Sequence, residues 1–570
     1  METRRNKRLI LLGLVVVVGL SAYLRLSGIT WGIKSVAGIR LESSEGKPGY
    51  GHYLSFHPDE FISIRGMSPI RLLRGKLQAP DAYFEGTFNY YLWALPRMLY
   101  DLHDEEGAVA RRKLAGGEIT FILLSGRLLS VAFDVTTLIL LFAIICEMTN
   151  QGLPALLGAL LYGVFPIQVI YSHFMRTYAL ANLLCVLVIW LSLKALKHRH
   201  WLLFVITGVA AGLAAATRYP AGFVLSVPCA LILFQRQATK EPWRQRFGTS
   251  FVYLLSGPLW LLASGFVLGF FVGEPMLFLD FRSVVDAILF EASHYAPPGA
   301  RKPFDLTPIW KYIFLLIPYA TYPVLWLLIY VSTIYVILRP SLWSTVIPLW
   351  VFAMLYTYSM AKGYVDHFAR LTMLLMPLLC IFVGLAWGEL FPKIVKRPLA
   401  FIVAVIMVSL ILPTIVFDWA YGQAMKLRDV RELLRNDMRD LIKDRSATTI
   451  AVSEHGGYGG YFYTAMPAVV PLKSKSNNVA VQLESSLGTP ADFLVIGFEG
   501  PLTEDSRDST IRKVETGGTF RFMKAYSRAP TIFGKRFDLS KFPSDMTYPF
   551  PTILLFRKVS DPYEAVASAW

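Results

Sequence analysis

Two adjacent carboxylates follow the first hydrophobic segment of a chain that is otherwise largely apolar. They are Asp59 and Glu60, within the stretch 56–61 that reads FHPDEF. Acidic side chains close to a bilayer are rare because removing water from them costs free energy, so a pair in this position is a candidate functional site. A carboxylate with a tuned pKa can accept the proton of a hydroxyl as that hydroxyl attacks. We therefore take Asp59 and Glu60 as candidate catalytic residues.

The same pair also fits a structural role and a metal-binding role. Asp59 follows a proline and has the residue type of a helix N-cap, which is the structural alternative. The two carboxylates could instead hold a divalent cation. The chain has no HxxxH or HExxH spacing, so the sequence predicts no zinc site, and it has no GxxxxGK or GxGxxG motif for nucleotides. No cofactor beyond the divalent cation is predicted.

Basic residues at the ends of later apolar segments are the second kind of group that could do chemistry. Arg176, Arg218 and Arg370 each stand at the outer edge of a span, where a cation can hold a phosphate at headgroup depth. The alternative is a side chain that extends its charge from a helix end to the interface. Arg127 is expected to help line the same cavity, whereas Asp134 is expected to have a structural partner. The predicted substrate-binding set is His57, Arg127, His173, Arg176, Arg218, Tyr219 and Arg370.

The composition predicts a protein that crosses a membrane many times. Hydrophobic residues make up 54% of the 570 residues, and a mean hydropathy of +0.47 is rare among soluble domains. A net charge of +16 would suggest nucleic acid as the partner of a soluble protein. Here much of the basic charge lies in short clusters between apolar runs, which suits anionic lipid headgroups, so no nucleic-acid partner is predicted. The four cysteines lie in apolar runs, which indicates packing rather than disulfides.

About eleven segments are long and apolar enough to cross the hydrocarbon core, which takes about 20 helical residues. No small-residue cleavage site follows the first segment, so we expect a retained span rather than a signal peptide. Prolines inside several segments predict kinks, which membrane helices tolerate. The predicted spans are 9–25, 119–146, 152–171, 177–196, 201–217, 220–235, 249–272, 309–338, 343–361, 371–390 and 399–418.

Short basic clusters predict the orientation of these spans. The clusters are 4–8, 194–200, 236–246 and 393–397. With eleven spans all of them fall on one side, which is then the cytoplasmic side. The loops 26–118 and 272–308 and the tail therefore face outward. The predicted location is the plasma (inner) membrane, with the candidate site on its extracytoplasmic face.

Three outward-facing segments have patterns of their own. Residues 84–93 are rich in aromatic side chains and residues 277–291 are amphipathic, so both predict helices at the membrane surface. Apolar side chains over 430–442 repeat at helical spacing. We predict a transmembrane domain over 1–418 and a small extracytoplasmic α/β domain over 419–570. The β-like runs of that domain are 449–453, 493–498 and 552–557.

The order of these motifs resembles that of the polytopic GT-C glycosyltransferases, and within them the protein-O-mannosyltransferase-like family that includes the aminoarabinose lipid A transferases. The motifs that carry the resemblance are 57–60, 84–91, 126–130, 172–178, 212–219 and Arg370 before Pro377. The chain departs from the family at Tyr178, where many members carry Asp. It also reads EGT at 85–87, where many members carry Lys-Pro-Pro. The second departure removes a cation from the expected phosphate site and leaves that role to the three arginines.

The resemblance implies a GT-C-like fold and an inverting glycosyltransferase. Members of this family move a sugar from a polyprenyl-phosphate donor to an acceptor on the outer face. In this chain Asp59 would accept the proton of the acceptor hydroxyl, and the acceptor would be a protein, a lipid or a glycan. Arginines at headgroup depth would stabilise the charge on the departing phosphate. The alternatives are a transporter or flippase of lipid-linked sugars, and a non-catalytic membrane scaffold.

Overall fold

The chain forms two compact units. The computed structural model describes residues 4–33, 116–235, 257–295, 307–360, 368–394, 399–443 and 491–559, and shorter stretches at 40–41, 52–53, 56–57, 59–67, 70, 72, 75, 77, 83, 85–101, 445, 447–455, 469, 472 and 479–483. The first unit consists of Met1–Leu26, Ile62–Arg111 and Ser125–Asp418, and the second of Ser27–Phe61, Arg112–Leu124 and Trp419–Trp570. The second unit therefore contains part of the first loop as well as the tail. The basic cluster 236–246 and Pro58 lie outside the described residues.

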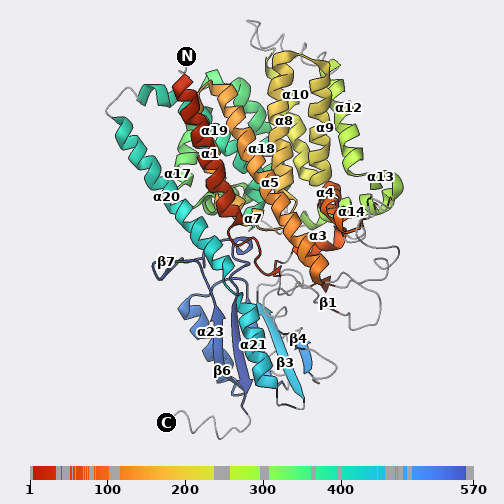
Figure 1. The fold of residues 1–570 in the computed structure, drawn as a ribbon, viewed down its shortest axis with the longest axis vertical. Coiled ribbons are helices and arrows are strands. Elements are labelled where there is room, and N and C mark those ends of the chain that lie inside the picture. The colour runs from red at the N-terminus through yellow and green to blue at the C-terminus, as the bar shows by residue number, and fades with distance from the viewer. Residues whose placement is uncertain are drawn as a thin grey trace. The chain divides into compact units, whose positions relative to one another are not determined.

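Helices make up the described part of the first unit (Figure 1). In chain order the helices up to residue 426 are α1 (Arg4–Leu26), α3 (Glu60–Met67), α4 (Phe88–Asp101), α5 (Gly116–Thr149), α6 (Gly152–Val164), α7 (Pro166–Ser172), α8 (Tyr178–His198), α9 (Trp201–Thr217), η2 (Tyr219–Leu225), α10 (Ser226–Gln235), α12 (Gly257–Gly273), α13 (Met276–Leu279), α14 (Phe281–Tyr295), α15 (Thr307–Lys311), η4 (Tyr312–Leu316), α16 (Ile317–Thr321), α17 (Trp326–Ile337), η5 (Pro340–Leu342), α18 (Trp343–Met360), η6 (Ala369–Leu375), α19 (Met376–Ile394) and α20 (Leu399–Lys426). The η4 segment is a π-helix, and the other η segments are 3₁₀ helices.

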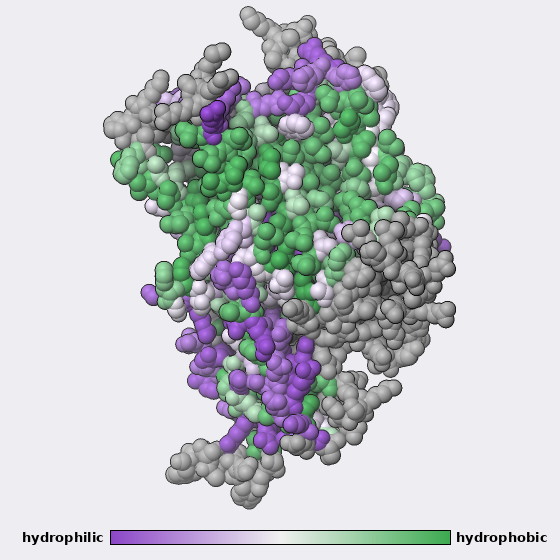
Figure 2. Space-filling view, viewed as in Figure 1, coloured by the Kyte–Doolittle hydropathy of each residue, from purple (hydrophilic) through white to green (hydrophobic). Residues whose placement is uncertain are grey.

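Six helices are long and apolar enough to cross a membrane, and the bent pair α6–α7 brings the number to seven, among the residues that the structure describes. Five shorter apolar helices also occur: Trp201–Thr217, Tyr219–Leu233, Gly257–Gly273, Ile309–Thr321 and Trp326–Ile337. Each predicted span coincides, where it is described, with one or two of these helices. The multi-pass helical fold is thus confirmed, and the number of crossings stays a prediction. Hydrophobic residues dominate the surface of this unit in Figure 2, as lipid contact requires.

Two predicted spans are each divided into two helices near a proline. The α6 and α7 helices meet at an angle of 55° where Pro166 opens α7. The predicted run 309–338 is not one continuous helix, because Tyr322 has a φ of 78° between α16 and α17. Tyr322 precedes Pro323, and a residue before proline is biased away from the helical conformation.

Glycines allow α9 and α12 to pack backbone against backbone. Gly208 and Gly212 of α9 face Gly265 and Gly269 of α12, and a Cβ atom added at any of the four would overlap the backbone of the partner helix. Within each helix the two glycines have the GxxxG spacing, which lets membrane helices approach closely. This contact determines where the C-terminal ends of both helices lie, which matters for the candidate site.

A buried ion pair joins α1 to α5. Arg25 Nε donates to Asp134 Oδ2 at 2.8 Å, and the Tyr162 hydroxyl donates to the other carboxylate oxygen at 2.5 Å. The guanidinium also donates to the Ser21 hydroxyl and the Gly163 carbonyl. Buried charges are tolerated only when they are paired and hydrogen-bonded, and the pair of Arg25 and Asp134 meets both conditions. The expected structural partner of Asp134 therefore exists, and it is Arg25.

The tail forms a mixed five-stranded sheet with the strand order β4-β3-β5-β9-β6. Its strands are β3 (Thr448–His455), β4 (Val479–Leu483), β5 (Phe493–Phe498), β6 (Phe520–Ser527) and β9 (Thr552–Lys558), with the helices α21 (Val430–Ile442) and α23 (Glu504–Thr516). The pairs of β3 with β4 and β5 are parallel, whereas β9 pairs antiparallel with β5 and β6. The small α/β fold is thus confirmed. Short two-stranded ladders are formed by β1 (Arg40–Leu41) with β2 (His52–Tyr53) and by β7 (Thr531–Ile532) with β8 (Lys535–Arg536).

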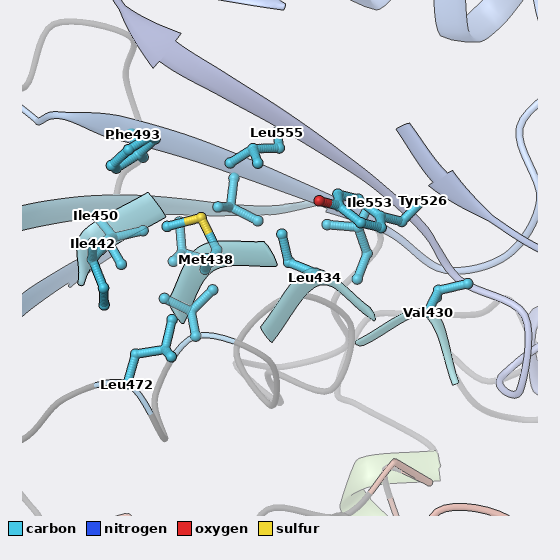
Figure 3. Close-up of a cluster of buried hydrophobic side chains, with 13 residues drawn as sticks. Val430, Leu434, Met438, Ile442, Ile450, Leu472, Phe493, Tyr526, Ile553 and Leu555 are labelled. Atoms are coloured by element: carbon cyan, nitrogen blue, oxygen red, sulfur yellow. The ribbon is translucent and has the colours of Figure 1, made fainter. Parts of the chain in front are cut away.

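The sheet is buried on both faces, which explains its continuous apolar strands. Figure 3 shows one face, where Leu434 and Met438 of α21 pack against Ile553 and Leu555 of β9. Successive side chains of β9 point to opposite faces of the sheet. On the other face its apolar side chains pack with Val514 of α23. The helix expected over 430–442 forms with those bounds.

Candidate functional site

In the first unit, a turn over residues 83–89 is bonded to the C-terminal ends of α9 and α12. The Tyr219 hydroxyl donates to the Tyr83 carbonyl. Asn89 Nδ2 donates to the Thr217 carbonyl at 3.0 Å. The Thr87 hydroxyl donates to the carbonyl of Gly273, the last residue of α12, at 3.0 Å. The glycine-mediated packing of these two helices therefore determines where the turn lies.

Gly86 gives the turn its shape. Its φ is +97°, and a Cβ atom at this position would overlap the carbonyl of Ala216. Only glycine satisfies both conditions without strain. The next amide, Thr87 N–H, donates to Glu274 Oε2 at 3.0 Å. Burial raises the pKa of Glu274 to about 8, and its hydrogen bonds with Thr87 offset this only in part.

Glu85 lies between two of the predicted arginines. One oxygen, Oε1, forms an ion pair with Arg176 Nη2 and lies 3.8 Å from Arg218 Nη1. The three side chains are at most 6% exposed. The sequence had suggested that the acidic residue merely removes a cation here. In the structure, the Glu85 carboxylate is an anion that contacts both arginines. The sequence motif alone did not reveal these contacts.

Tyr178 brings the third predicted arginine into the same cluster. The Arg218 guanidinium lies over the Tyr178 ring, 4.4 Å from its centroid. The Tyr178 hydroxyl is within the electrostatic influence of Arg218, Arg370 and Arg176. The side chain that departs from the family pattern thus carries a cation–π contact instead of a carboxylate. Three arginines and one glutamate give this cluster a formal charge of +2, which suits an anionic ligand.

Two further predicted residues, His173 and Arg127, are buried in the first unit. His173 is buried, and its Nδ1 lies 2.7 Å from the Val169 carbonyl. Arg127 is also buried, in the first half of α5. The neighbouring Ser130 hydroxyl donates to the Phe174 carbonyl at 3.0 Å, so α5 packs on the turn that precedes Arg176. Tyr219 contacts the turn at 83–89 through its hydroxyl group.

The two candidate catalytic acids belong to the second unit, and the arginines belong to the first. His57 and Glu60 are fully buried, and Asp59 is half-buried. The Asp59 amide donates to His57 Nδ1 at 3.1 Å, which closes a tight local turn before α3. No group of three His, Cys, Asp or Glu side chains that could hold a metal is found among the described residues. The divalent cation at Asp59 and Glu60 stays a prediction.

Ser63 of α3 contacts the turn that carries Arg176 within the first unit. Its hydroxyl donates to the Met175 carbonyl at 2.7 Å. Arg176 Nη1 in turn donates to the Ser63 hydroxyl at 3.4 Å.

An apolar cavity of about 360 Å³ lies in the first unit among η4, α17, α18 and α19. One wall is Leu375, the last residue of the 3₁₀ helix that also contains Arg370. Aromatic and aliphatic side chains make up nearly all of the lining, including Tyr312, Ile334, Trp350 and Phe382. Such a cavity suits a hydrocarbon chain.

Comparison with known proteins supports the resemblance noted from the motifs. Residues 119–267 match the family model for dolichyl-phosphate-mannose-protein mannosyltransferases. Over this segment the chain is similar to that family. No curated protein sequence matches the chain.

Two solved structures of ArnT from Cupriavidus metallidurans align with the chain. The complex with undecaprenyl phosphate has 11% sequence identity and a TM-score of 0.42, over 95% of this chain and 97% of that chain. The apo structure has 11% identity and a TM-score of 0.36, over 96% of this chain and 97% of that chain.

Proposed function

We propose that the protein is an inverting glycosyltransferase that takes a sugar from a polyprenyl-phosphate donor on the extracytoplasmic face of the membrane. The observation that carries the proposal is the buried contact of Arg176 and Arg218 with Glu85 in a helical membrane unit, with Arg218 over the Tyr178 ring. A buried group of cations at the ends of membrane helices suits a phosphate on a lipid. The family match over 119–267 supports the same class of enzyme.

The lipid part of the donor has a suitable place beside these arginines. A 3₁₀ helix rises about 2 Å per residue, so Leu375 lies on the order of 10 Å from Arg370 along η6. A phosphate bound by Arg370 would therefore leave its isoprenoid chain within reach of the apolar cavity. The isoprenoid chain of the donor would replace water or lipid in this cavity. This is favourable because the lining is apolar.

In this proposal the chemical step is a single displacement. The acceptor oxygen attacks the anomeric carbon, and the bond from that carbon to the phosphate oxygen breaks. The Asp59 carboxylate accepts the acceptor proton, and polyprenyl phosphate leaves with the electron pair. The arginines stabilise the charge that grows on the departing phosphate.

The proposal is tested with purified protein and a panel of radiolabelled polyprenyl-phosphate hexoses. We expect labelled sugar to appear on an acceptor and free polyprenyl phosphate to be released. Transport of the intact donor across a vesicle would show a flippase instead, and binding without either event would show a scaffold. Asp59→Asn is expected to reduce transfer to a small residual rate in a folded protein that still binds donor. Normal turnover of that variant would remove Asp59 from the role of base.

A further inference from the structure

The segment that leads to Asp59 is bonded to the C-terminal domain within the second unit. The central residue of this connection is Arg431, in the first turn of α21, which is fully buried. Its Nη1 donates to the Phe56 carbonyl at 3.1 Å. Its guanidinium also lies 4.1 Å from the centroid of the Phe56 ring. One arginine of the tail therefore contacts both the backbone and the side chain of the residue that opens the acid motif.

The position of the Arg431 guanidinium is itself determined by Asp429. Nε and Nη2 of Arg431 donate to the two Asp429 oxygens at 2.7 and 2.8 Å, which makes a bidentate pair. Asp429 also accepts from the Arg431 amide at 2.8 Å and from Trp31 Nε1 at 3.0 Å. A bidentate pair of this kind has one geometry, and its burial prevents the exchange with water that weakens surface pairs.

Tyr548 extends the same connection to His57. Arg431 Nη2 donates to the Tyr548 carbonyl at 3.3 Å. The Tyr548 ring meets the His57 ring edge to face, with centroids 5.1 Å apart. His57 Nδ1 then accepts from the Asp59 amide at 3.1 Å. A continuous series of contacts thus runs from Arg431 through Phe56, Tyr548 and His57 to Asp59.

We propose that the C-terminal domain is a positioning element of the transfer reaction, and that Arg431, held by Asp429, sets the place of the Asp59 carboxylate. The inference rests on the proposed role of Asp59 as the base. A buried guanidinium is costly unless its donors are used, and here Arg431 also donates to the Phe56 and Tyr548 carbonyls beside the acid segment. The domain therefore contributes geometry to the reaction and no reacting group. Arg431 is a positioning residue.

The test measures kcat, KM for the donor, donor affinity and Tm for the full-length protein in detergent. Arg431→Lys keeps the charge but cannot make the bidentate pair and both carbonyl bonds. We expect kcat to fall by about 100-fold, which is the effect of a displacement on the order of 1 Å in a catalytic group. Donor affinity is expected to stay within about twofold, because the arginine cluster that binds phosphate belongs to the first unit. Asp429→Asn is expected to give the same pattern.

Lys524→Gln is the matched control. Lys524 pairs with Asp437 at 2.7 Å on the exposed surface of the same domain, so its loss changes one charge of the domain without touching Phe56. We expect normal kcat from this variant. An unchanged kcat in Arg431→Lys, or a loss that follows only the amount of folded protein, would overturn the proposal.

A double variant separates this proposal from the assignment of the base. If Arg431 acts through Asp59, then Arg431→Lys in the Asp59→Asn background causes no further loss of the residual rate. A full additional loss would show that Arg431 acts elsewhere. If Asp59→Asn alone leaves turnover normal, the assignment of Asp59 as the base is wrong. If only the positioning role of Arg431 is wrong, Asp59→Asn still loses transfer.

Discussion

Glu85 and Arg176 form a buried ion pair in the membrane unit, and the same carboxylate oxygen lies 3.8 Å from Arg218. In the proposed enzyme this carboxylate occupies part of the space around the cations that would bind a phosphate. The second oxygen, Oε2, is buried and makes no hydrogen bond with the described residues. Glu85 therefore lowers the positive charge of the cluster and competes with an anionic ligand for two of its arginines.

Removal of the Glu85 charge is expected to tighten the binding of the product. Polyprenyl phosphate carries up to two negative charges, and the cluster would rise from +2 to +3 in Glu85→Gln. One charge-assisted hydrogen bond is worth about 1.5–3 kcal/mol, so polyprenyl phosphate should bind at least about tenfold more tightly. Turnover should fall because product leaves more slowly.

The measurement is product inhibition by polyprenyl phosphate together with direct binding by calorimetry. Glu85→Asp keeps the charge and serves as the control, with an expected change of less than about threefold. Equal or weaker product binding in Glu85→Gln would show that Glu85 organises the arginines and does not compete with phosphate.

The arginines themselves are expected to control donor affinity more than chemistry. Arg176→Ala or Arg218→Ala should raise the Kd for polyprenyl phosphate by about 10–100-fold, because each removes a charge-assisted contact. Arg282→Ala is the control, since the Arg282 side chain is 94% exposed on α14. Unchanged affinity in both cluster variants would place the phosphate elsewhere.

Glu274 gives stability a dependence on pH with a definite sign. Burial raises its pKa from 4.5 to about 8, so the folded protein binds a proton that the unfolded chain releases between these values. The contribution to stability is complete below about pH 4.5, falls as pH rises through about 8, and then stays constant. Glu274→Gln mimics the protonated acid.

A comparison of Tm for the native protein and Glu274→Gln at about pH 5, 7 and 9 checks this expectation. The variant should match the native protein at the lowest pH. At the highest pH its Tm should be several degrees higher, because pKa values of 4.5 and about 8 correspond to up to about 5 kcal/mol of stability. The same pH dependence for both proteins would show that Glu274 is ionised in the fold.

Gly86→Ala should disturb the turn that carries Glu85. The left-handed φ alone costs about 1–3 kcal/mol for a residue with a side chain, and the overlap with the Ala216 carbonyl adds to it. We expect a lower Tm and weaker binding of polyprenyl phosphate. Gly19→Ala is the control, because a Cβ atom there meets nothing within 4 Å. Equal Tm values for the two variants would contradict the strained turn.

Local patterns in the sequence predicted much of the secondary structure. Apolar runs predicted the membrane helices, and the helical spacing over 430–442 predicted α21 with its bounds. The runs 493–498 and 552–557 predicted β5 and β9 to within a residue. These features depend on residues close together in the chain, which is why periodicity and length revealed them. The prolines of the run 309–338 predicted a kink, but a hydropathy criterion did not reveal that the run divides into two helices at Tyr322.

The sequence by itself determined that this is a multi-pass membrane protein with a small α/β tail and three arginines at span ends. Only the tertiary structure decided which groups meet. It paired Asp134 with Arg25 and Glu85 with Arg176, and it joined Phe56 to Arg431 across 375 residues of sequence. The physical reason is that burying a charge requires a partner, and the fold alone determines which distant residue comes close enough to be that partner.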